Sequence, residues 1–384
     1  MKRIAVFGAT GQVGRAIISR WARSRNTQIV AIVRNEFGAL GLKGLPNTEI
    51  RTGDPANADS VAELLEGCDA VLNSALATGL PNQSRALNRA MVENSAEVAR
   101  RAGRLRAFVQ LSSVAVYGFP VAERKGDFTR PQPATGYGRD KLYIEEIVRR
   151  SFTSDSCPGH VVRVGHVLGP YQGHSRGIIA QLFDPSFQLP FDGSKPSNAI
   201  HVDHLAFALR ALIDQRGSSN CFNAVGDGNP TWHQVFEDHA RTVGTKMPRS
   251  MSPEESSQRR AAELAKLRSS RMVQAARDTL RPAVSAFVSA FASSPAIRDL
   301  GHEVLVRAPR SAESAIKRAY TSWSARDQTS AVSSSPQTDV PPWYYWDGVP
   351  GPNLLERFNV QQELTAAEIE SDLKAWASAM ANPL

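Results

Sequence analysis

The first 165 residues alternate short apolar runs with amphipathic stretches of helical period. The runs are rich in β-branched residues, which favour buried strands, and the stretches between them repeat apolar residues every three or four positions. This alternation predicts a doubly wound α/β fold, with a parallel sheet covered by helices on both faces. The expected strands are 3–8, 28–34, 49–54, 69–75, 107–113 and 160–165, and the expected helices are 12–24, 57–66, 84–103 and 137–151.

After residue 165 the alternation weakens, which predicts a smaller lobe interleaved with the sheet domain. The expected pieces of this lobe are a helix at 203–214, a strand at 221–225 and a helix at 231–243. A later Ser/Thr/Pro-rich segment has the composition of a linker. The predicted domains are a sheet domain (1–165), a substrate lobe (166–250), a basic helical insertion (251–323), a linker (324–342) and a C-terminal tail with a helix (343–384).

The distribution of charge restricts the partners. The chain has 45 Lys and Arg against 37 Asp and Glu, and residues 251–320 hold twelve basic and seven acidic residues, which is +5 of the net +8. This segment has few aromatic side chains for base stacking, so we expect no nucleic-acid binding. A solvated or oligomer-facing helix pair is the simpler interpretation. Peripheral membrane contact stays open, because the apolar stretch 284–292 follows the basic residues.

Composition also bears on location and metals. The three cysteines, Cys68, Cys157 and Cys221, show neither a disulfide framework nor the spacing of zinc ligands, so no metal is expected. No apolar run reaches the roughly 20 residues of a membrane span. The first residues show no charged leader followed by an apolar run. We therefore expect a cytoplasmic protein.

Three glycines, Gly8, Gly11 and Gly14, stand where the first expected strand meets the first helix. A turn there directs free N–H groups and the positive end of the helix toward a pyrophosphate. Gly11 lacks a Cβ that would keep the phosphate away, and Gly14 lets the helix approach the strand. A merely structural turn is the alternative, but the position in the first βαβ unit favours a dinucleotide site.

Residues that follow the next strands indicate which dinucleotide binds. Arg34 ends the second strand, where an acidic residue would bind the 2′-hydroxyl of NAD, and a cation there suits a 2′-phosphate, so NADP is favoured over NAD. Asp54, which ends the third strand, is placed to bond the adenine edge. The expected cofactor-binding residues are Gly8, Thr10, Gly11, Gln12, Val13, Gly14, Arg34, Asp54, Ala75, Tyr137, Lys141 and Val164.

Ser113, Tyr137 and Lys141 are the candidate catalytic residues. Tyr137 and Lys141 are four apart, so on a helix they share one face, and Ser113 ends the fifth strand. A neighbouring ammonium and an oxidised nicotinamide ring would lower the pKa of a phenol from its ordinary value near 10, while the serine bonds the substrate oxygen. Tyrosine at a helix start is often a packing residue, but the order of these motifs within one sheet favours catalysis.

Together these motifs resemble the extended short-chain dehydrogenases/reductases of the NAD-dependent epimerase/dehydratase kind, over roughly residues 1–245. The resemblance implies a Rossmann domain, a nicotinamide dinucleotide, Ser113, Tyr137 and Lys141 as the active trio, and a dimer formed through the helices at 84–103 and 137–151. The motifs are GATGQVG (8–14), GD (53–54), SSVAVYG (112–118), YGRDK (137–141), RVGHVLGP (163–170), IHVDHLAFAL (200–209) and FNAVGDGNPTWHQVFE (222–237).

Departures from the family pattern restrict the reaction. Val114 and Ala115 follow the active serine where family dehydratases carry an Asp-Glu pair, so dehydration is not expected. The family often has Pro and Asn where this chain has Val164 and His166. His166 is therefore expected to face the substrate, and a structural role for this histidine is the alternative.

Two further positions concern the substrate. Many nucleotide-sugar enzymes of the family place an Arg shortly before the segment at 200–204, where this chain offers Lys195 and Asn198. Ser113, His166 and Asn198 are the candidate substrate contacts. The supporting asparagine of the family corresponds to Asn88 or Asn94.

The sequence therefore predicts an NAD(P)-dependent epimerase or dehydrogenase/reductase, with hydride transfer at a secondary alcohol or ketone of a sugar or nucleotide-sugar. Two alternatives stay open. Arg34 and the missing diphosphate-binding arginine suit an NADPH-dependent reductase of a non-sugar carbonyl compound. A dinucleotide-binding sensor without turnover would keep the glycines, and the intact trio argues against it.

Overall fold

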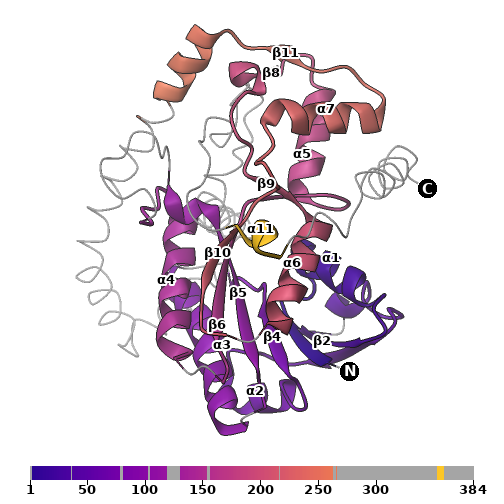
Figure 1. Ribbon diagram of the computed structural model, residues 1–384, viewed down its shortest axis with the longest axis vertical. Coiled ribbons are helices and arrows are strands. Elements are labelled where there is room, and N and C mark those ends of the chain that lie inside the picture. Colours follow the sequence, from indigo (N-terminus) through magenta and orange to yellow (C-terminus); the bar gives the residue numbers. More distant parts are fainter. Residues whose placement is uncertain are drawn as a thin grey trace, which may run out of the picture.

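The computed structural model is built around a seven-stranded parallel sheet (Figure 1). The structure describes residues 2–262, except 36, 78–80, 103, 119–129, 154–155 and 216, together with residues 265 and 353–358. The strand order is β10-β6-β5-β4-β1-β2-β3. The strands are β1 (Lys2–Phe7), β2 (Thr27–Val33), β3 (Thr48–Thr52), β4 (Ala70–Asn73), β5 (Ala107–Ser113), β6 (Gly159–Val164) and β10 (Cys221–Ala224).

Helices cover both faces of this sheet, which confirms the doubly wound α/β fold. Successive side chains of a strand point to opposite faces, so Ile4 and Val6 of β1 join one buried cluster while Ala5 and Phe7 join the other. The first cluster packs against α1 (Gln12–Trp21) and α6 (Val202–Asp214). The second packs against α2 (Ala58–Leu64), α3 (Pro81–Ala102) and α4 (Gly136–Ser151).

The order of the strands fixes where a ligand can bind. The chain runs from β1 outward to β3 and then returns to the other side of β1 with β4. In a doubly wound sheet the crevice lies beyond the carboxyl ends of the strands, at the point where the order reverses. That point is between β1 and β4, where the turn with the three glycines begins.

Two elements that the sequence assigned to the smaller lobe belong to the sheet layer instead. The predicted strand at 221–225 is β10, which pairs in parallel with β6 at the edge of the main sheet. The predicted helix at 203–214 is α6, and its Leu205 and Leu209 are fully buried in the cluster that includes β1. Their apolar patterns predicted a strand and a helix correctly. The patterns carried no information about the part of the molecule against which each element packs.

The smaller lobe is assembled from short elements with a buried cluster of their own. It contains β7 (His166–Leu168) paired with β9 (Ala199–His201), and β8 (Gln188–Leu189) paired with β11 (Arg249–Ser250). Helices α5 (Gly173–Leu182) and α7 (Trp232–Val243) pack against each other beside them (Figure 1). Within the part of the chain that the structure describes, short 3-10 helices lie in connections: η1 (Phe37–Ala39), η2 (Val114–Tyr117) and η4 (Pro190–Gly193).

The C-terminal part of the chain returns to the sheet domain. Residues 253–262 are helical, as predicted for the start of the basic insertion, and α11 (Leu354–Phe358) lies on α6 and β10 (Figure 1). Asn353 donates from Nδ2 to the Val225 carbonyl at 3.3 Å. The rest of the predicted insertion, the linker and the helix of the tail lie outside the described residues.

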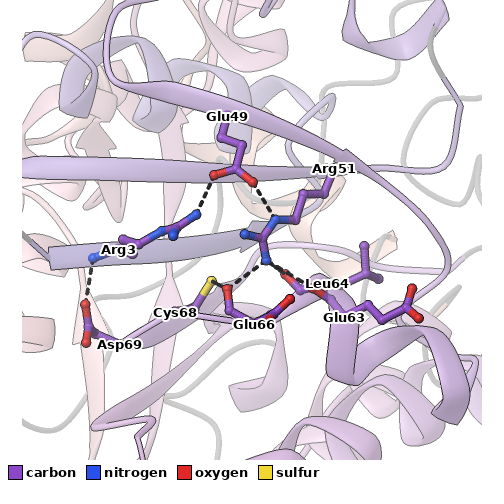
Figure 2. Close-up of polar contacts among 8 residues, drawn as sticks. All are labelled: Arg3, Glu49, Arg51, Glu63, Leu64, Glu66, Cys68 and Asp69. Carbon is purple, nitrogen blue, oxygen red and sulfur yellow. Dashed lines mark hydrogen bonds and ion pairs between the residues drawn. The ribbon is translucent and has the colours of Figure 1, made fainter.

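Charged side chains connect β1, β3 and the end of α2 (Figure 2). Glu49 on β3 accepts hydrogen bonds from Arg3 of β1 and from Arg51 at 2.7 Å. Nη1 of Arg51 also donates to three backbone carbonyls at the end of α2, those of Glu63, Leu64 and Glu66, at 2.8–3.0 Å. Since the last carbonyls of a helix have no intrahelical donor, Arg51 satisfies them and fixes α2 to the sheet.

Candidate active site

Ser113, Tyr137 and Lys141 come together at the carboxyl end of β5. Ser113 is the last residue of β5, and Tyr137 lies in the first turn of α4. Their side chains share a hydrogen bond. A Cβ on Gly138 would lie 2.5 Å from the Ala115 carbonyl oxygen, so glycine at this position lets the start of α4 press against the backbone that follows Ser113. Thr135 caps the helix by accepting from the Gly138 N–H.

Lys141 is buried beneath Tyr137. Its Nζ donates to the Leu111 carbonyl at 2.9 Å and lies 5.9 Å from the centre of the Tyr137 ring. Burial lowers the pKa of this ammonium group to about 8, and the Glu145 carboxylate acts in the opposite direction. A cation so close to the phenol stabilises a phenolate, which is the electrostatic help that a tyrosine base requires.

Loss of water around Tyr137 raises the pKa of its phenol, and the hydrogen bond with Ser113 lowers it. Because 45% of the residue remains exposed, water screens part of the effect of burial. Since its pKa is raised from the ordinary value near 10, the phenol keeps its proton at neutral pH. A protonated phenol beside Ser113 is chemically able to act as a proton donor.

The glycine turn has the geometry of a dinucleotide site. Gly8 follows β1 with φ +76°, and a Cβ there would lie 2.6 Å from the Ala75 backbone nitrogen, so Gly8 is required by the contact between β1 and β4. Gly14 is required as well, because its Cβ would lie 2.3 Å from the Gly8 carbonyl oxygen. Gly11 is different. It is exposed, and among the described residues other than its chain neighbours, the one atom within 4 Å of its missing Cβ is the Gly8 oxygen at 3.3 Å.

Gly11 is also the N-cap of α1, and no side chain caps this helix. The first turn of α1 therefore has backbone N–H groups that no N-cap side chain satisfies, and the turn itself contains no acidic residue. A pyrophosphate fits this place, because it accepts hydrogen bonds from a helix N-terminus and a Cβ at Gly11 would obstruct it. The residues present thus fit a nicotinamide dinucleotide.

The other predicted cofactor residues lie around this turn. Thr10 is exposed, and its methyl group faces Gly38, while Val13 packs against the core. Gln12 reaches the smaller lobe, because its Oε1 accepts from the Gly173 N–H at 3.1 Å. The start of α5 therefore lies against the glycine turn, a contact that the sequence did not predict.

The remaining predicted residues each stand at, or within two residues after, the end of a strand of the main sheet: Arg34, Asp54, Ala75 and Val164. Arg34 is exposed after β2, and Asp54 is exposed after β3, where its carboxylate accepts from the Ala56 N–H at 2.9 Å. The Ala75 N–H donates to Asn73 after β4, and Val164 pairs with Ser113 across β6 and β5. All four thus lie near the carboxyl ends of strands of the main sheet, and their contact with a cofactor stays a prediction.

The structure places the candidate substrate residues less directly. His166 is buried in β7, with its Nδ1 2.9 Å from Nε2 of His174 and its ring 5.5 Å from that of Trp232. Asn198 is buried, has φ +49°, and its side-chain oxygen accepts from Asn229 at 2.9 Å. These contacts give both residues structural tasks, and contact with a substrate stays a prediction.

Both candidates for the supporting asparagine hold loops. Asn88 of α3 is buried, accepts from the Ala77 N–H at 2.8 Å and donates to the Ala77 carbonyl, so it fixes the loop after β4. Asn94 donates to the Ala56 carbonyl at 3.1 Å beside Asp54. Only Asn88 lies next to the strand end that borders the glycine turn.

A buried polar network behind the trio was not predicted. Glu145 of α4 accepts from Ser112 and from Arg163, and Arg163 donates to Tyr117, whose hydroxyl donates to Asn223. Glu145 is four residues after Lys141 on the buried side of α4. A carboxylate on the apolar face of a helix is the one signal in the sequence that could have indicated this network.

Two negative observations apply to the described part of the chain. Among these residues, no three His, Cys, Asp or Glu side chains gather in a way that could bind a metal ion. Within the same ranges, every helix is too short or too polar to traverse a lipid bilayer.

Comparison with known proteins identifies the family. The model of the NAD dependent epimerase/dehydratase family matches residues 4–224, which is more than half of the chain. The chain belongs to this family, whose members are NAD-dependent enzymes. This confirms the resemblance seen in the glycine turn and in the segments around Ser113 and Tyr137.

Two curated relatives are similar to part of the chain. The dTDP-6-deoxy-L-talose 4-dehydrogenase (NAD(P)(+)) of Kitasatospora kifunensis is 28% identical over 187 residues, which cover 47% of this chain and 58% of the relative. The uronate dehydrogenase of Agrobacterium fabrum is 30% identical over 167 residues, which cover 43% of this chain and 61% of the relative. The matches thus span less than two thirds of the length of these relatives.

Solved structures share the fold. The dTDP-glucose 4,6-dehydratase of Bacillus anthracis, in complex with NAD, aligns with a TM-score of 0.53 at 18% identity and covers 67% of this chain and 90% of its own. At this identity the likeness concerns the fold alone.

Proposed function

We propose that this protein is an NAD(P)-dependent oxidoreductase or epimerase that transfers hydride at a secondary alcohol or ketone of a sugar. The hydrogen-bonded pair of Ser113 and Tyr137 beside the buried Lys141 ammonium is the observation that carries this proposal. The trio lies at the carboxyl end of the sheet that also bears the glycine turn. The names of the two curated relatives, a deoxysugar dehydrogenase and a uronate dehydrogenase, support a sugar substrate.

The dinucleotide would be held by the glycine turn and by the residues at the strand ends. The first turn of α1 would bind the pyrophosphate, and Arg34 after β2 would bind a 2′-phosphate, which favours NADP over NAD. Asp54 and Ala75 would flank the adenosine side, and Lys141 would bond the ribose near the reactive ring. When bound, the nicotinamide ring supplies the hydride acceptor or donor.

The residues of the chain manage the proton. Ser113 donates a hydrogen bond to the substrate oxygen, and Tyr137 gives a proton to that oxygen in reduction or takes one from it in oxidation. Lys141 stabilises the phenolate that forms when Tyr137 has given its proton. Val114 and Ala115 supply neither acid nor base after Ser113, so elimination of water is not part of the proposed reaction.

The segment 195–198 favours a substrate without a nucleoside diphosphate. Ser197 is buried and donates to the Pro230 carbonyl at 2.6 Å, and the side chain of Asn198 is paired with Asn229. Lys195 is the one cation of this segment, and its Nζ lies 5.6 Å from the centre of the Phe191 ring. A free sugar or a sugar acid needs less positive charge here than a diphosphate does. His166 stays a proposed substrate contact beside it.

A panel assay with the full-length chain tests the proposal. Uronates, dTDP-sugars, UDP-sugars and an aromatic ketone are offered with NAD(H) and NADP(H), and the absorbance of the reduced nicotinamide is followed. We expect turnover with a sugar and a higher kcat/KM with the NADP couple. Epimerisation appears instead as a changed sugar by NMR without net absorbance change.

The same panel contains its controls. Replacement of Arg34 with Ala is expected to lower the preference for the NADP couple, while the NAD couple is affected less. Turnover of the aromatic ketone alone would favour the non-sugar reductase. Tight dinucleotide binding with no turnover of any substrate would contradict the proposal and favour a sensor. The homodimer through α3 and α4 also stays a prediction, which light scattering of the same sample tests.

A further inference from the structure

Glu145 is a buried carboxylate that takes no part in the proposed proton transfer. It lies on α4 one helical turn after Lys141, and only 6% of its surface is exposed. A buried charge is costly unless several hydrogen bonds satisfy it. A residue of this kind on the same helix face as Lys141 calls for an explanation.

Three elements satisfy this carboxylate. From β6, Arg163 donates to it from Nη2 at 2.7 Å and from Nε at 3.1 Å, a bidentate contact. From β5, the Ser112 hydroxyl donates to it at 2.5 Å. Arg163 then donates from Nη1 to the Tyr117 hydroxyl of η2 at 2.9 Å, and Tyr117 donates to Asn223 of β10, also at 2.9 Å.

The same short stretch of β5 is held twice from α4. Lys141 donates to the Leu111 carbonyl, and Glu145 accepts from Ser112, the residues that directly precede Ser113. Tyr137, Lys141 and Glu145 thus contact Ser113, Leu111 and Ser112, respectively. Because rigid neighbours keep reacting groups in place, these paired contacts set the position of Ser113 relative to Tyr137.

Charge adds to this geometry. Burial lowers the pKa of Lys141, and the Glu145 carboxylate is the charged group that raises it again. Among the described residues, the other ionisable groups around the network are Arg163 on β6, Tyr117 on η2, Cys221 on β10 and Tyr137 itself. On the outer side of α4, Arg85 of α3 pairs with Asp140 at 2.8 Å.

We propose that Glu145 is a positioning residue of the active site, whose carboxylate, fixed by Arg163 and Ser112, keeps the Lys141 ammonium group and the end of β5 in place for Tyr137. This inference rests on the proposed function only for its catalytic consequence. The position and charge of Lys141 are properties of the protein without cofactor. They can be measured without any assay of turnover.

The test is an NMR titration of the Lys141 amine in the cofactor-free protein, with the signal assigned from its loss in Lys141→Met. Four proteins are compared: the unaltered chain, Glu145→Gln, Glu145→Gln/Arg163→Met and Glu146→Gln. Glu146 is the matched control, since it is the next residue of α4 and pairs with Arg150 at the surface. The double variant guards against misfolding, because removal of both buried charges leaves neither unpaired.

We expect the titration midpoint of Lys141 to fall by about 1 pH unit in Glu145→Gln, where Arg163 keeps its positive charge. A smaller fall is expected in the double variant, and none in Glu146→Gln. Midpoints in both Glu145 variants equal to that of the Glu146 control would overturn the inference.

Turnover provides a second readout. If the proposed function holds, Glu145→Gln lowers kcat more than it changes KM, and activity declines at a lower pH on the alkaline side than in the Glu146 control. An unchanged kcat and alkaline limb would contradict the catalytic consequence. If the unaltered chain turns over no substrate, the proposed function fails while the titration still decides the role of Glu145.

Discussion

Individual residues at the crevice owe their roles to what surrounds them. Tyr137 and Lys141 would be ordinary helix residues if Gly138 did not allow α4 to press on the backbone after Ser113. Likewise, Gly11 differs from Gly8 and Gly14 because the protein itself has little need of a glycine there. The chemistry of the site thus depends on a few close backbone approaches.

His160 shows the same dependence in the core, where it affects stability. It is buried in β6, and neither ring nitrogen has a hydrogen-bond partner within the described residues. Burial lowers its pKa from 6.5 to about 4. The folded protein therefore keeps His160 neutral below pH 6.5, while the unfolded chain takes up the proton. Stability from this residue is present above pH 6.5 and is lost as the pH falls toward 4.

Replacement of His160 with Leu is expected to remove this acid sensitivity. Between pH 7 and pH 5 the free energy of unfolding should fall by about 2 kcal/mol less in His160→Leu than in the unaltered chain. Urea denaturation at both pH values measures the free energy of unfolding of each protein. The exposed His233, changed to Gln, serves as control. Equal pH dependence in all three proteins would show that His160 does not contribute.

The sequence predicted the trio but not the network behind it. Ser113, Tyr137 and Lys141 follow known spacings along one segment of chain. Glu145 depends on partners from β5, β6, η2 and β10, which are brought together only by the order of strands in the sheet. Contacts between residues so far apart leave no periodic pattern that a single sequence could show.

Among the elements, the predicted strands and helices of the sheet domain formed close to their expected limits. Their periodic apolar residues face two separate cores. Helix α5 was missed because it opens with glycine after Gln172, whose side chain does not cap it. Helix α11 was missed because five residues are too few to show a helical period.

The packing of α11 leads to a prediction about stability. Leu354 is fully buried in the cluster that contains α6 and the β1 strand. Its replacement with Ala should lower the free energy of unfolding by about 2–4 kcal/mol, through lost contacts and a cavity. Chemical denaturation measures this, and the exposed Glu356→Ala in the same helix should change it by less than about 0.5 kcal/mol. Equal free energies of unfolding for Leu354→Ala and Glu356→Ala would mean that α11 does not stabilise the fold.

At the scale of the whole molecule, the sheet domain and the smaller lobe meet at the glycine turn. Gln12 of α1 accepts from the start of α5, while α11 and β10 close the far edge of the sheet. The trio at the end of β5 lies in the same crevice as this turn. The arrangement brings a phenol and an ammonium group to the same end of the sheet as the glycine turn, as the proposed hydride transfer to or from a sugar requires.

Replacement of Tyr137 with Phe tests this central claim most directly. The phenyl ring keeps the packing of α4 but has no proton to give, so kcat should fall roughly 10²- to 10⁴-fold while the Kd of the dinucleotide stays nearly the same. Stopped-flow turnover and fluorescence titration of the dinucleotide supply the two values. Turnover close to that of the unaltered chain would contradict the account.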